Sequence, residues 1–145
     1  METKYRKLHL TLFCIYIAFM LYLLFNRSGG IEGIDYWEQV QTNLCLKPFR
    51  TITLFLRALN KPGYSFKSLI NLGGNVIMFI PLGFFLPRVF PKFQKLWRTI
   101  LLTVLIITVV ELAQLFTLLG VCDIDDLILN VTGAAIGYGI FKLLK

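Results

Sequence analysis

Two groups of carboxylate and amide side chains stand out in an otherwise apolar chain. Glu111 and Gln114 lie three residues apart inside the third long apolar run. Asp123, Asp126 and Asn130 follow at positions i, i+3 and i+7, which places all three on one face of a helix. An ionisable side chain costs about 2.5–3.5 kcal/mol to insert at the centre of a membrane helix, so such a residue marks a functional site by default.

A third polar group lies upstream, in the second apolar run. Asn71 and Asn75 are four residues apart and therefore share a helix face. Polar groups inside a membrane face the bundle interior or a wet cavity, because lipid cannot satisfy their hydrogen bonds. The three groups lie at similar depth in the outer half of the membrane, given the rise of an α-helix per residue. We predict that they form one ligand-binding polar cluster. The alternative is that these side chains bond to one another and only hold the helices together.

Several kinds of chemistry suit such a cluster. It can hold a divalent cation through hard oxygen ligands, bind the polar part of a lipid-linked sugar or peptide, or share a proton. The chain has no HExxH or GxSxG motif and no phosphate-binding glycine loop, and its only histidine, His9, lies across the membrane from the cluster. We therefore expect no cofactor and no nucleophilic hydrolase, and we assign no catalytic or metal-binding residue.

The composition predicts an integral membrane protein. The chain has 145 residues, of which 57% are apolar and 16% charged, and its mean hydropathy is +0.71. A soluble domain of this size cannot hide so much apolar surface. The net charge of +7 comes from short basic patches between apolar runs. That pattern argues against nucleic-acid binding and suits contact with anionic lipid.

Four apolar runs are long enough to cross a membrane. We predict an all-α integral membrane protein with one domain over residues 1–145 and four transmembrane helices at 8–25, 69–89, 99–120 and 124–144. The first run resembles a signal peptide, but no small-residue cleavage site follows it, so we interpret it as a retained helix.

The segment 26–67 between the first two spans is the longest polar stretch. Within it, residues 48–60 place apolar side chains on one helical face and Arg50, Thr53 and Arg57 on another. This helix is too short to span a core of about 30 Å. We predict an amphipathic helix in the membrane interface, with a re-entrant segment as the alternative.

The basic residues predict the orientation. The N-terminus, the loop 88–98 and the C-terminus are basic, and an even number of spans places them on the same side. The positive-inside rule makes that side the cytoplasm. Segment 26–67 and the acidic turn 121–126 then lie outside. Within this turn Asp125 lies off the face of Asp123 and Asp126, and we expect it to contact solvent or cap the turn.

Small residues predict where helices pack closely. Gly73 and Gly74 lie in the second span, and Gly133 and Gly137 stand at GxxxG spacing in the fourth. Glycines at this spacing allow helix backbones to approach one another. The contact forms either within the bundle or between copies in a homo-oligomer.

Taken together, these motifs resemble the VanZ-like family. The second span reads N-x-x-x-N-x-x-x-F-x-P-x-G from Asn71 to Gly83, and it is followed by Glu111-Leu-Ala-Gln114. The stretch from Asp123 to Tyr138 and the stretch from Asn43 to Ile52 also match family motifs. Family members often carry an Arg shortly before the acidic turn, whereas residues 117–122 contain none.

The resemblance implies a multi-pass protein of the bacterial cytoplasmic membrane. The family's founding member is linked to low-level resistance to teicoplanin-type glycopeptides, which carry a lipid tail. We therefore expect a cell-envelope protein that binds or remodels a lipid-linked cell-wall component in an outward-facing polar pocket. The alternatives are a membrane enzyme that uses Glu111 and Asp126 as acid/base or metal ligands, and a small scaffold or partner subunit.

Overall fold

The computed structural model describes residues 3–26, 29–58 and 65–145. For residues 3–5, 65–69 and 71 the description covers the backbone alone. The predicted site residue Asn71 therefore has a described backbone on the second long helix, while its side chain lies outside the described part.

Long helices dominate the described chain. They are α1 (Thr3–Phe25), α4 (Ser65–Val89), α5 (Leu96–Phe116) and α6 (Ile124–Leu143). Each contains an apolar stretch long enough to cross a membrane: Arg6–Phe25, Leu72–Val89, Leu96–Phe116 and Ile124–Leu143. The protein is therefore an all-α, multi-pass membrane protein, as its composition predicts.

Short elements connect the long helices. Between α1 and α4 the chain forms α2 (Tyr36–Thr42), β1 (Leu44–Cys45) and α3 (Arg50–Ala58). The 3-10 turn η1 (Pro91–Phe93) joins α4 to α5, and β2 (Cys122–Asp123) leads into α6. Helix α3 falls inside the predicted amphipathic segment 48–60, whose last two residues lie outside the described part.

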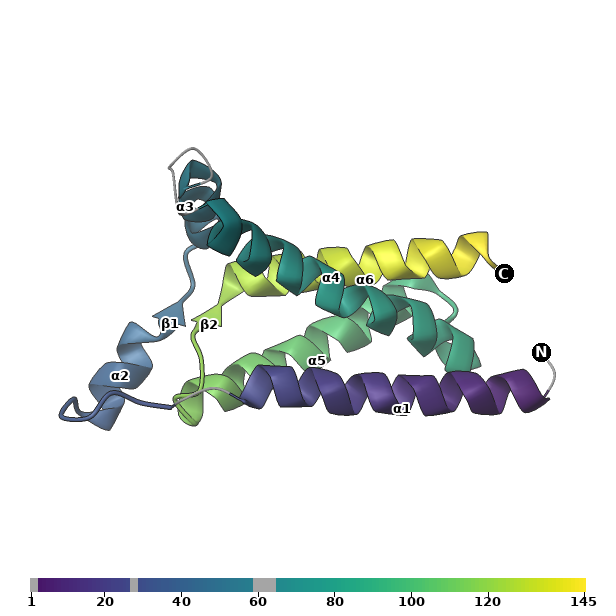
Figure 1. Cartoon of the computed structure of the whole chain (residues 1–145), viewed down its shortest axis with the longest axis horizontal. Helices are drawn as coiled ribbons and strands as arrows, with labels where there is room; N and C mark the ends of the chain where they lie inside the picture. The colour runs from purple at the N-terminus through teal and green to yellow at the C-terminus, as the bar shows by residue number, and fades with distance from the viewer. Residues whose placement is uncertain (1–2, 27–28, 59–64) are drawn as a thin grey trace.

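The two ends of the bundle differ in character. The N- and C-termini lie at one end together with the connection between α4 and α5, and α2, α3, β1 and β2 gather at the other (Figure 1). At the end with the termini, Arg88 Nε donates to His9 Nε2 at 2.9 Å. His9 is thus paired with α4 and lies far from the acidic turn along the bundle.

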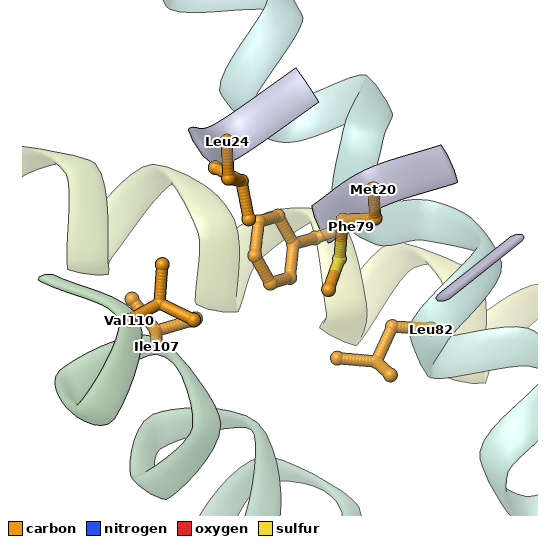
Figure 2. Close-up of a cluster of buried hydrophobic side chains, with 6 residues drawn as sticks. All are labelled: Met20, Leu24, Phe79, Leu82, Ile107 and Val110. Atoms are coloured by element: carbon orange, nitrogen blue, oxygen red, sulfur yellow. The ribbon is translucent and has the colours of Figure 1, made fainter. Parts of the chain in front are cut away.

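A hydrophobic cluster joins α1, α4 and α5. It is formed by Met20, Leu24, Phe79, Leu82, Ile107 and Val110 (Figure 2). Phe79 is 1% exposed and Leu82 is fully buried. Large side chains on the outer faces, such as Leu101 and Leu105 of α5, are exposed and suit contact with lipid.

Helices α4 and α6 form the most extensive helix pair in the described chain. A Cβ at Gly133 would lie 2.1 Å from the Val76 carbonyl oxygen, and one at Gly137 would lie 1.9 Å from the Ile80 carbonyl oxygen. The glycines of the GxxxG motif therefore pack against α4 within the same chain. The GxxxG spacing predicts a close approach of helix backbones, and α4 and α6 approach one another closely at these two glycines.

The glycine contact on α4 differs from the expectation. A Cβ at Gly73 or Gly74 would meet no described atom within 4 Å, so these two glycines make no close helix contact there. Gly83 makes it instead, because a Cβ at this position would lie 1.9 Å from the Ala134 carbonyl oxygen. Helix α6 crosses α4 further along than the adjacent glycines suggest.

The C-terminal boundary of the third long helix differs from the prediction, because the helix ends before residue 120. Helix α5 ends at Phe116, with Thr117 as its C-cap. Leu118 then adopts a positive φ of 56°, which ends the helical path. Residues 117–121 are thereby free to turn back toward β1.

Candidate functional site

The acidic turn before α6 is held against the segment that precedes α3. Strands β1 and β2 pair in parallel, with Leu44 opposite Cys122 and Cys45 opposite Asp123. The Cys122 N–H also donates to the Asn43 carbonyl at 2.9 Å. This pairing brings two segments that are far apart in the sequence to one end of the bundle.

Asp125 fixes the start of α3. Its carboxylate accepts hydrogen bonds from the backbone N–H groups of Phe49 at 2.5 Å, Thr51 at 2.8 Å and Ile52 at 3.1 Å. The first N–H groups of a helix have no partner within the helix, and a carboxylate satisfies them while complementing the helix dipole. Phe49 enters α3 with a positive φ of 61°.

The expectation that Asp125 contacts solvent or caps its own turn was therefore wrong. The side chain is fully buried, and it caps another helix. Asp125 and Asp123 both bond to Thr51, so the start of α3 rather than solvent covers this side of the turn. The interaction joins α3 to the start of α6.

Asp123 is the N-cap of α6. One carboxylate oxygen accepts from the Asp125 N–H at 2.9 Å, and the other accepts from the Thr51 hydroxyl. The side chain is 6% exposed. Asp123 thus connects the first turn of α3 with the first turn of α6, next to the bonds made by Asp125.

Glu111 supports this turn from α5. Its Oε2 accepts from the Asp123 N–H at 3.2 Å, and its side chain is 8% exposed. Burial raises the pKa of the neighbouring Cys122 thiol, and the charges of Glu111 and Asp123 raise it further. Glu111 therefore holds the backbone of β2 in position.

Asp126 pairs with the predicted asparagine of α4. The Asn75 amide Nδ2 donates to Asp126 Oδ1. The two residues are 51 positions apart in the sequence, and the bond crosses between α4 and α6 where these helices begin to pack. The contact brings together two members of the predicted polar cluster.

A cavity of about 930 Å³ opens beside this pair. Its polar lining comes from Thr51, Asn75, Asp123 and Asp126, and none of its described lining residues is Lys or Arg. Its apolar walls come from α1, α3, α4 and the residue before β2: Tyr16, Phe19, Met20, Leu23, Leu24, Phe55, Ile70, Ile77, Met78, Pro81 and Val121. Gly74 completes the described lining.

The cavity has an open side. Phe19 of α1 is 59% exposed and Ile77 of α4 is 67% exposed, although both line the cavity. The cavity is therefore reached laterally between α1 and α4. Exposed apolar side chains such as these suit contact with the acyl chains of a bilayer.

Three of the predicted cluster residues do not line this cavity. Glu111, Gln114 and Asn130 are buried, but none lines this cavity. Gln114 Nε2 donates to the Leu24 carbonyl at 2.7 Å and so ties α5 to the last turn of α1. Asn130 is 4% exposed, and its Oδ1 has no hydrogen-bond partner among the described residues.

Thr51 and Phe55 are site residues that the sequence reasoning did not assign. Both line the cavity from α3, four residues apart on one helical face. The available signal was the position of Thr51 inside the stretch from Asn43 to Ile52 that matches a family motif. The amphipathic pattern also marks the apolar face of α3, but it does not say what that face covers.

The described residues contain no group of three or more His, Cys, Asp or Glu side chains that could hold a metal ion. Within the described part, the carboxylates of the acidic turn serve as acceptors of hydrogen bonds from backbone, hydroxyl and amide groups.

Comparison with known proteins identifies the family. No curated protein and no solved structure matches the chain. The family model VanZ/LLP1 matches residues 13–145, which include the second half of α1, all of α4, α5 and α6, and the whole acidic turn. This chain therefore belongs to the VanZ/LLP1 family.

Proposed function

We propose that this chain is a bacterial cell-envelope protein that holds a lipid-linked envelope component in the cavity between α1, α3 and α4. By retaining or altering that component, it lowers the access of lipid-tailed glycopeptides such as teicoplanin. Its partners are membrane lipids or a lipid-linked cell-wall precursor. The protein is then located in the bacterial cytoplasmic membrane, where such lipids reside.

The observation that carries this proposal is the division of the cavity into two chemical parts. Asp123, Asp126, Asn75 and Thr51 meet at its polar end, and large apolar side chains form its walls. Amphiphiles have the same division, with a polar head and apolar chains. Ligand cavities of this kind bind through apolar area and obtain specificity from a few polar groups.

The basic residues support an outward-facing polar end. The acidic turn and α3 lie at the end of the bundle opposite the termini (Figure 1). The other end carries the basic N-terminus, the basic connection after α4 and the basic C-terminus. The positive-inside rule places those segments in the cytoplasm, so the polar end of the cavity faces the outer leaflet.

Antibiotic susceptibility tests the proposal. A susceptible Gram-positive host expresses the wild type, Asp126→Asn, or the control Glu32→Gln, at matched membrane levels. Glu32 is exposed, and its substitution also removes one negative charge. We expect teicoplanin protection from the wild type and the control, loss of protection in Asp126→Asn, and unchanged vancomycin susceptibility throughout. Protection retained by Asp126→Asn, or absent from the wild type, would contradict the proposal.

One observation favours an enzyme as the second candidate. Two carboxylates, Asp123 and Asp126, line the same cavity, and Asp123 accepts a hydrogen bond from the Thr51 hydroxyl. Such pairs can divide acid and base roles. If the protein is an enzyme, expression of the wild type changes the chemical composition of extracted lipid precursors. Expression of Asp126→Asn then leaves the composition as it is in cells without the protein. A binding protein would leave the composition unchanged.

The scaffold alternative loses its main support. The GxxxG face of α6 is the surface through which a partner helix would pack, and α4 of the same chain occupies it at Gly133 and Gly137. A partner subunit would have to use another surface.

A further inference from the structure

The end of the bundle that holds the connection between α4 and α5 is strongly basic. Segments 3–9, 88–98 and 142–145 lie there (Figure 1), and they contain nine Lys or Arg residues and no Asp or Glu. Glu2, which lies outside the described part, adds at most one negative charge. We infer that this end binds the head group of an anionic phospholipid, with the phosphate between the loop around Gln94 and the last turns of α6. This site goes beyond the proposed function, because the polar end of the cavity lies at the opposite end of the bundle.

Gln94 brings cations from two segments together. Its backbone carbonyl accepts from the Tyr138 hydroxyl at 2.6 Å, and its side-chain Oε1 accepts from Lys145 Nζ at 3.0 Å. Within the same connection, Arg98 Nη1 donates to the Lys92 carbonyl at 3.1 Å. The connection between α4 and α5 is therefore joined to the last turns of α6, and basic side chains of both segments surround one loop.

Aromatic rings hold cations on both sides of this junction. The Arg98 guanidinium lies over the Trp97 ring, 5.2 Å from its centroid. The Lys142 ammonium lies over the Tyr138 ring, 5.9 Å from its centroid. The face of an aromatic ring attracts a cation but carries no net charge. These contacts therefore orient the two cations without neutralising them.

The charge of this end also has no partner of opposite sign in the described chain. Residues 72–110 and 127–145 contain no Asp or Glu, and Arg98 and Lys145 are exposed. Like charges placed close together repel one another, and a bound anion relieves the repulsion. The hydrogen bonds around Gln94 use one of the five N–H groups of Arg98 and one of the three of Lys145. The others can donate to a phosphate, whose oxygens accept charge-assisted bonds.

The surroundings of these cations favour a lipid over a soluble anion. Trp97 is 59% exposed, Leu101 is 62% exposed and Leu143 is 86% exposed. Exposed aromatic and apolar side chains at the end of a membrane helix belong at the interface, where the phosphates of phospholipids lie. A phospholipid can cover these side chains with its acyl chains while its phosphate meets the cations. Basic sites between membrane helices bind anionic head groups in this way.

The test uses the position of the two tryptophans. Trp97 lies at this site and Trp37 lies in α2 at the other end, so Trp37→Phe leaves one tryptophan as a local reporter. The full chain is placed in phosphatidylcholine nanodiscs with a minor fraction of brominated phosphatidylglycerol or, separately, of brominated phosphatidylcholine. Bromine on the acyl chains quenches a tryptophan that it contacts. We expect phosphatidylglycerol to quench Trp97 more strongly, with an apparent binding constant about tenfold higher.

Two double variants separate a site from general surface charge. Arg98→Gln with Lys142→Gln removes two cations of the site, whereas Arg6→Gln with Lys7→Gln removes two exposed cations of α1 at the same end. The net charge of the two variants is equal. We expect the first to lose the preference for phosphatidylglycerol and the second to keep it. Both lipids are compared within each variant, so a change in Trp97 emission caused by the loss of Arg98 does not affect the result.

Each other outcome would overturn the inference. Equal quenching by the two brominated lipids in the Trp37→Phe protein would mean that this end does not select anionic lipid. A preference kept by the Arg98→Gln, Lys142→Gln variant would place the bound lipid elsewhere. Equal loss of preference in the two double variants would show that only the net charge of this end acts, without a site around Gln94.

Discussion

Helix α6 is attached to the rest of the molecule in two different ways along its length. At its start, carboxylates of the acidic turn bind the backbone of α3, the Thr51 hydroxyl and the Asn75 amide. Further along, Gly133 and Gly137 bring its backbone against α4. The first attachment is polar and directional, whereas the second depends on van der Waals packing and the absence of side chains.

The difference explains where a cavity can form. Close backbone contact at Gly133 and Gly137 leaves no room between α4 and α6. At the acidic turn, polar side chains rather than glycines join α6 to α3 and α4, and the cavity opens beside Asp123 and Asp126. The glycine contact therefore sets the position of α6 against α4, and the polar contacts set the position of the cavity's polar lining relative to these two helices.

The largest effect is expected at the glycine contact. Gly137→Leu forces a side chain into the Ile80 carbonyl, 1.9 Å from the Cβ position, and should cost more than about 3 kcal/mol of folding free energy. Thermal unfolding in nanodiscs measures the loss. Gly139→Leu is the control, because a Cβ at Gly139 meets no described atom within 4 Å. Equal destabilisation by the two variants would show that close backbone contact does not hold α6.

The next effect is expected at the buried cap of α3. Asp125→Ala removes the partner of three backbone N–H groups and should cost about 2–3 kcal/mol. Hydrogen exchange should accelerate at the amides of Thr51 and Ile52. Asp35→Ala provides the comparison, because Asp35 caps the exposed helix α2 and its loss should cost about 1 kcal/mol.

Comparing the loss of stability in Asp125→Ala and Asp35→Ala tests whether a buried cap stabilises the protein more than an exposed one. If Asp35→Ala proves as costly as Asp125→Ala, or if exchange at Thr51 stays unchanged in Asp125→Ala, then α3 is not held by the acidic turn.

The smallest effect is expected at Cys122. Burial is the main cause of the raised pKa of this thiol, and the charge of Glu111 raises that pKa further. A raised pKa means less thiolate at pH 8, so maleimide should react slowly there and faster as the pH rises. Glu111→Gln removes one cause and should lower the pKa, which increases the rate at pH 8.

Labelling is measured in a Cys14→Ala, Cys45→Ala background, so that Cys122 is the only thiol. The Gln side chain can still accept the Asp123 N–H that Glu111 accepts. An unchanged labelling rate in Glu111→Gln would mean that the Glu111 charge does not act on this turn.

The sequence predicts the helices well, because their length and hydropathy are set by the membrane. It also predicts one polar cluster on these helices, and two of its members, Asn75 and Asp126, are in contact. It does not predict that Glu111, Gln114 and Asn130 lie away from the cavity. Depth along the membrane normal follows from position in the chain, but rotation about each helix axis depends on packing.

The misplaced expectations for Asp125 and for Gly73 and Gly74 have related causes. The partners of Asp125 lie 73 to 76 positions away, and they reach it because β1 pairs with β2. Two residues per strand leave no recognisable pattern in the sequence. The glycines of α4 indicate where close approach is possible, and only the crossing point with α6 decides that Gly83 is used.

The central claim is that the cavity between α1, α3 and α4 carries the function. The most direct measurement compares teicoplanin susceptibility of cells expressing Gly74→Leu and Gly73→Leu at equal membrane levels. These changes add the same side chain to adjacent open positions, and only Gly74 lines the cavity. We predict that Gly74→Leu gives no protection and that Gly73→Leu protects as the wild type does. Full protection by Gly74→Leu would contradict the account.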